Sequence, residues 1–123
     1  MLKVLIGYTA ADQKIASILR IAYMDDEGNI VDGNGIDFEC PQCRGIANEL
    51  VVPLKKIAEG YPDINSGPRD YPNVVVIGQN DGDACISDGN NKVIINRDDV
   101  HVLAGWLEAV RLLHLKHGSF PPL

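Results

Sequence analysis

The stretch that decides the fold is VVVIGQNDGDACISDGNNKVIINR, residues 74–97. Three short β-prone segments are separated here by NDG and GNN, which are typical of tight hairpin turns. The pattern predicts an antiparallel β-meander. A long helix should follow, capped by Asp98 or Asp99. Its apolar residues recur at helical spacing and form one wide face that includes Trp106, so we expect Trp106 in the core.

Upstream of this stretch, KVLIGY (3–8) predicts a buried strand. Thr9 and Asp12 have the spacing of a capping box, and apolar residues then recur at helical spacing as far as about Tyr23, which predicts a helix. Residues 24–39 are rich in Asp, Asn and Gly and predict a loop or a ragged hairpin.

Residues 41–60 again show helical spacing, with Pro53 expected to kink the helix or to split it in two, and Gly60 expected to end it. Strands and helices in this order favour the α+β class. The length of 123 residues fits a single domain over residues 1–123.

Composition excludes several classes of function. Seventeen acidic against eleven basic residues give a net charge of −6, and a nucleic-acid reader needs a basic face, so we expect no direct nucleic-acid binding. No apolar run approaches the roughly 18 residues that span a bilayer, and the N-terminus lacks the features of a signal peptide. We therefore expect no membrane association, a cytoplasmic location, reduced thiols and no cofactor.

The sequence ECPQC places Cys40 and Cys43 at the expected start of a helix, where the helix dipole can stabilise a thiolate. Two windows, 36–60 and 69–88, are similar to stretches of glutaredoxins and thioredoxins. That resemblance implies a thiol-disulfide oxidoreductase in which Cys40 attacks, Cys43 resolves and Pro72 is the cis proline that packs against the dithiol.

The same two cysteines also have the spacing of a zinc knuckle. A closed zinc site needs four ligands, and the candidates are Cys40, Cys43, Cys85 and His101. No second CxxC motif or paired histidine completes the pattern, so the cysteines can equally be reduced and structural.

Residues 61–70 are too few for the strand and helix that the oxidoreductase families insert before their proline. No complete catalytic set is present in the sequence. The leading interpretation is therefore a non-catalytic binding or regulatory module that engages a protein or a small ligand and also self-associates. Its expected contact residues lie in the irregular segment 61–73 and the first hairpin turn: Arg69, Tyr71, Asn80, Asp81 and Asp83.

Overall fold

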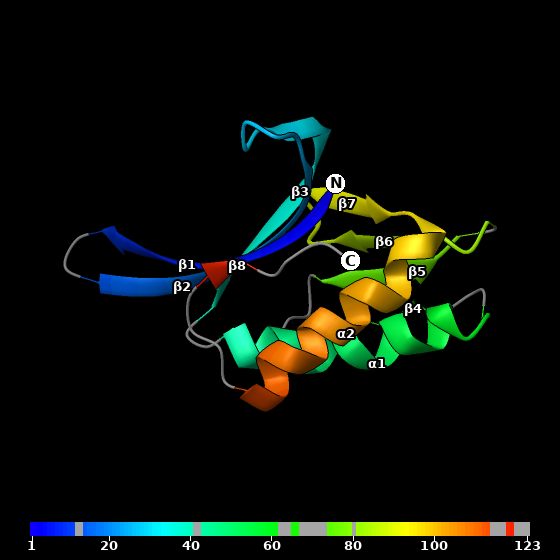
Figure 1. The fold of residues 1–123 in the computed structure, drawn as a ribbon. Helices are drawn as coiled ribbons and strands as arrows, with labels where there is room; N and C mark the ends of the chain where they lie inside the picture. The colour runs from blue at the N-terminus through cyan, green and yellow to red at the C-terminus, as the bar shows by residue number, and fades with distance from the viewer. Residues whose placement is uncertain are drawn as a thin grey trace.

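The computed structural model describes residues 1–11, 14–40, 43–61, 65–66, 74–79, 81–113 and 118–119 (Figure 1). Within these ranges the elements follow one another as β1 (Leu2–Ala11), β2 (Lys14–Met24), β3 (Ile30–Cys40), α1 (Cys43–Ala58), β4 (Asn65–Ser66), β5 (Val75–Gly78), β6 (Ala84–Ser87), β7 (Lys92–Ile95), α2 (Arg97–Leu113) and β8 (Gly118–Ser119). The strands form two antiparallel sheets, with the orders β3-β2-β1-β8 and β4-β5-β6-β7. The prediction of an α+β protein is confirmed.

The prediction of a helix from Thr9 to Tyr23 is wrong. β1 continues to Ala11, and Lys14–Met24 forms β2. β2 is paired on both sides, with β1 and with β3. Leu19 and Ile21 are fully buried and Tyr23 packs against the same core, so the apolar residues that matter alternate as in a strand. The helical spacing of the apolar residues in this segment therefore does not reflect the structure that the segment adopts.

Residues 24–39, predicted as a loop or a ragged hairpin, form a turn followed by most of β3. The Asp25 side chain organises the turn, because its Oδ1 atom accepts hydrogen bonds from the amides of Glu27 (3.0 Å) and Asn29 (2.9 Å). Such side-chain-to-backbone bonds are the reason that aspartate favours turns.

Strand β3 contains an irregularity where its register with β2 shifts between Ala22 and Met24. Asp32 and Gly33 have positive φ angles there, 53° and 67°, in the left-handed region that these two residue types tolerate. Gly35 then lies opposite Ala22, and a Cβ atom at Gly35 would come within 2.8 Å of the Ala22 Cβ. Glycine is therefore needed for the two strands to pair at this point.

The same irregularity links the two sheets through Asn34. Its Nδ2 atom donates to the Ile94 carbonyl (3.0 Å), and its Oδ1 atom accepts from the Ile94 amide (2.8 Å). A carboxamide offers the same donor and acceptor as a peptide group, so Asn34 acts as one more ladder position beside β7. This pair of bonds fixes β3 against the edge of the second sheet.

Helix α1 is a single helix that contains Pro53. Of the two predicted effects of this proline, the split into two helices is wrong, and the kink stays a prediction. Leu50 and Leu54 are fully buried on either side of Pro53. Their packing holds the helix together although proline cannot donate its backbone hydrogen bond.

The expected stop at Gly60 is confirmed. Gly60 has a φ of +96°, its amide donates to the Ile57 carbonyl (3.0 Å), and the Tyr61 amide donates to the Lys56 carbonyl (3.1 Å). These two bonds form a Schellman motif, which satisfies carbonyls that the last turn would otherwise leave without partners.

The predicted meander and the long helix after it are both confirmed. β5, β6 and β7 pair in sequence, and α2 spans 17 residues. In each of the three strands every second residue is buried, so one face of the small sheet packs on the core. The two helices lie side by side along this region (Figure 1), and the Lys55 Nζ atom of α1 forms an ion pair with Glu108 Oε2 of α2 at 2.7 Å.

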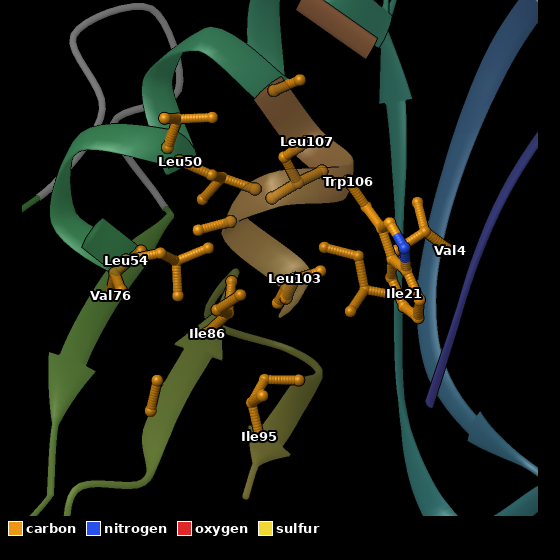
Figure 2. Packing of buried hydrophobic residues seen from close by; sticks show 14 of the residues in the cluster. Val4, Ile21, Leu50, Leu54, Val76, Ile86, Ile95, Leu103, Trp106 and Leu107 are labelled. Carbon is orange, nitrogen blue, oxygen red and sulfur yellow. The ribbon is translucent and has the colours of Figure 1, made fainter. Parts of the chain in front are cut away.

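One hydrophobic cluster contains residues from both sheets and both helices. Figure 2 shows Leu103 and Leu107 of α2 facing Leu50 and Leu54 of α1, with the indole of Trp106 beside the first sheet. Trp106 is only 8% exposed, so its predicted place in the core is confirmed. Among the described residues, neither helix combines the length and the apolar character that crossing a bilayer requires.

Candidate functional site

An open groove of about 520 Å³, lined by residues that the structure describes, lies beside the first turns of α2. One wall comes from α2, where Asp98, Val102 and Trp106 follow at intervals of four residues and so share a helix face. The opposite wall comes from the start of the first sheet, where Leu2 lies opposite Tyr23. We name this hollow the α2 groove; its lining residues are Met1, Leu2, Tyr23, Asn96, Asp98, Asp99, Val102 and Trp106.

The hydroxyl group of Tyr23 is the fixed polar centre of the α2 groove. It donates to Asp99 Oδ2 (2.8 Å) and accepts from the Asn96 amide (2.9 Å). Burial raises the pKa of Tyr23 well above its ordinary value, and the adjacent Asp99 carboxylate raises this pKa further. Tyr23 is therefore a neutral phenol that fixes the start of α2 against the first sheet.

Asp83 caps the N-terminus of α2, because its Oδ1 atom accepts a hydrogen bond from the Arg97 amide at 2.8 Å. The prediction that Asp98 or Asp99 provides this cap is wrong: both lie within the helix, in its first turn. The turn that carries Asp83 needs Gly82, whose φ is +84°, and a Cβ atom there would come within 2.7 Å of the Arg97 side chain.

The charge around the α2 groove is predominantly negative. Asp98 and Asp99 are both in the first turn of α2, where carboxylates are stabilised by the helix dipole. Arg97 approaches Asp98 only to 4.0 Å, and both side chains are largely exposed, so their attraction is weak. The amino group of Met1, which also lines the groove, donates to the Met24 carbonyl (3.1 Å). The groove thus has carboxylates in the first turn of α2 beside the largely buried apolar side chains of Leu2, Val102 and Trp106.

The residues predicted to contact a ligand are only partly within the described part of the chain. Arg69, Tyr71 and Asn80 lie outside the described residues. Asp81 is exposed in the turn between β5 and β6, where it is accessible to a partner. Asp83 is half-buried and engaged in capping α2, so its carboxylate already has a structural role.

The two cysteines of the CPQC motif lie on either side of a strand-to-helix junction. Cys40 is the last residue of β3 and Cys43 is the first residue of α1, in agreement with the expected helix start. Pro72 lies outside the described residues. The strand before the motif, β3, and the strand after residue 72, β5, belong to different sheets.

The other zinc candidates are separated in the fold. Cys85 is a half-buried free thiol on β6, and its neighbours Ala84 and Ile86 face the core, so Cys85 faces away from it. His101 is exposed on α2. Within the described ranges, no group of three or more His, Cys, Asp or Glu side chains is arranged to hold a metal ion.

The residues that form the polar centre of the groove were not identified from the sequence. Tyr23 and Asp99 are 76 positions apart, and Tyr23 was assigned to the end of a helix that is absent. No local motif marks either residue. Comparison of the chain with protein-family models, with curated proteins and with solved structures finds no match.

Proposed function

We propose that this acidic α+β protein is a non-catalytic binding or regulatory module of the cytoplasm, which holds a small ligand or a segment of a protein in the α2 groove. The observation that carries the proposal is the groove itself, in which apolar side chains and a few convergent polar groups line one concavity. The segment 61–73 and Asp81 remain the proposed additional contacts.

The chemistry of the α2 groove favours an organic cation with an apolar part. Leu2, Val102 and Trp106 line the groove and, at 4%, 9% and 8% exposure, present a narrow apolar edge to it. The Asp98 and Asp99 carboxylates can accept hydrogen bonds from an ammonium or guanidinium group. The Tyr23 hydroxyl already donates to Asp99, so it orients that carboxylate rather than acting as a base.

Calorimetric titration with phenethylamine, protonated at neutral pH, tests the proposal. Phenethyl alcohol is the matched neutral probe. We expect the amine to bind more tightly than the alcohol, and Asp98→Asn to weaken binding of the amine alone. The control Glu59→Gln removes one exposed carboxylate just beyond α1 and outside the groove lining, and it should leave both affinities unchanged. Equal affinities for both probes, or equal effects of the two variants, would contradict the proposal.

A thiol-disulfide oxidoreductase is the second candidate, favoured by the position of Cys43 at the first residue of α1. The Cys40 thiolate would attack a substrate disulfide and form a mixed disulfide, expelling one substrate thiolate. Cys43 would then displace the second substrate thiolate and leave a Cys40–Cys43 disulfide. Thiol titration against pH should give Cys40 a pKa well below about 8.5, and thiols that stay inert near neutral pH would exclude this candidate.

Zinc binding by the cysteines is the third candidate. A bound structural zinc contributes directly to folding, so a chelator should then lower the melting temperature. A purified protein in which metal analysis finds no zinc, and whose melting temperature is unchanged in chelator, would exclude this candidate.

A further inference from the structure

The hairpin of β1 and β2 extends beyond the rest of its sheet. The two strands pair from Leu2–Tyr23 as far as Ala11–Lys14, but β8 pairs with β1 only at Leu5 and Ile6. β3 pairs with β2 no further than Ser17. We name the projecting part, residues 7–11 and 14–16, the hairpin arm; Figure 1 shows it directed away from the helices and the second sheet.

Both outer edges of the hairpin arm lack strand partners among the described residues. At Gly7, where the arm begins, an added Cβ atom would meet nothing within 4 Å. A strand edge presents a row of backbone donors and acceptors, and a two-stranded ribbon alone is marginally stable in water. The arm therefore has the hydrogen-bonding capacity for another strand.

The sequence of the arm lacks the devices that prevent edge pairing. Those devices are mainly charged side chains and proline. From Val4 to Leu19 the only charged residues are Asp12 and Lys14, and the first proline of the chain is Pro41. The edge of β1 in the arm, from Gly7 to Ala11, is thus uncharged along its whole length.

Charge decides which partner fits this edge. Asp12 and Lys14 cancel, so the whole net charge of −6 lies outside the stretch from Val4 to Leu19. Two copies of the chain repel each other over the rest of their surfaces, but the neutral arms can approach without that cost. An edge strand is also self-complementary, because two identical antiparallel edges pair about a two-fold axis.

We infer that the hairpin arm is a homodimerisation surface, at which the β1 edges of two copies pair in antiparallel fashion and join their first sheets. This interface is separate from the α2 groove and does not depend on ligand binding there.

Sedimentation equilibrium tests the inference. The wild-type protein should reach twice the chain mass of 13.4 kDa as its concentration rises. The double variant Thr9→Lys with Ala10→Lys adds two positive charges to β1 within the arm of each copy, and it should raise the dimer dissociation constant about tenfold because like charges then meet across the paired edges. The control Ala58→Lys adds a positive charge at the exposed end of α1 and should leave the constant unchanged.

Hydrogen exchange of the wild-type amides from Gly7 to Ala11 provides a second measurement that needs no variant to fold. Protection should increase with protein concentration at the alternate amides that point away from β2, because the others already donate within the hairpin. A monomer at all concentrations overturns the inference, and so does a dimer that the double variant Thr9→Lys with Ala10→Lys leaves intact. Protection that is independent of concentration also overturns it, because the arm would then be covered by its own chain.

Discussion

Replacing Tyr23 with phenylalanine isolates the contact that joins the first sheet to α2. The ring that packs against the core is kept, while the bonds to Asp99 and to the Asn96 amide are lost. A hydrogen bond to a charged group contributes roughly 1.5–3 kcal/mol, and Asn96 is exposed, so water can satisfy its amide. We therefore expect the free energy of unfolding to fall by about 2 kcal/mol.

This loss of unfolding free energy can be expressed as a shift of the melting temperature. At roughly 2.1 cal/mol/K per residue, the unfolding entropy of 123 residues is about 260 cal/mol/K, so each kcal/mol shifts the melting temperature by about 4 °C. Tyr23→Phe should lower the melting temperature by about 8 °C in calorimetry or circular dichroism. Tyr61→Phe is the control, because it removes the same hydroxyl group from a side chain that is 58% exposed. Equal melting temperatures for the two variants would refute the reasoning.

The same variant has a defined pH dependence. Burial raises the pKa of Tyr23 in the folded state above its ordinary value of 10.0. A raised folded-state pKa means that the stabilising contribution is fully present below about pH 10 and is lost as the pH rises above it. The stability difference between wild type and Tyr23→Phe should hence be constant from neutral pH to about pH 10 and shrink above that. A difference that grew with alkaline pH would contradict the proposed role of the neutral phenol.

Three further substitutions test the packing, each by urea denaturation. Asn34→Leu removes both bonds to Ile94 and should cost about 1–3 kcal/mol; an unchanged midpoint would mean that these bonds do not hold the sheets together. Gly82→Ala forces a side chain onto a φ of +84° and should cost about 1 kcal/mol, with no loss only if the turn rearranges. Leu103→Ala, at a fully buried position, should cost about 2–5 kcal/mol, and a smaller loss would place Leu103 outside the core.

The meander and α2 could be predicted because their determinants are local. The turns NDG and GNN stand between β-branched segments, and the apolar residues of α2 keep one period through Val110. Each signal involves neighbouring residues only. The end of α1 could be predicted for the same reason, since Gly60 supplies the positive φ that ends it.

Strand β2 was predicted as a helix because local and non-local information disagree there. The capping-box pattern from Thr9 to Asp12 is a short-range signal, whereas pairing with β1 on one side and β3 on the other depends on distant residues. Only the pairing of β2 with both β1 and β3 shows that Leu19 and Ile21 lie on the face of the strand that packs on the core. The site was missed for a related reason, because the fold alone brings Tyr23 to Asp99.

The most direct test of the α2 groove as a binding site is to follow the amide chemical shifts of isotope-labelled protein during titration with phenethylamine. The account predicts saturable shifts at Tyr23, Asp98 and Val102 and at the Trp106 indole, which are reduced in Asp98→Asn. Shifts that are absent, or confined to residues outside the groove, would contradict it.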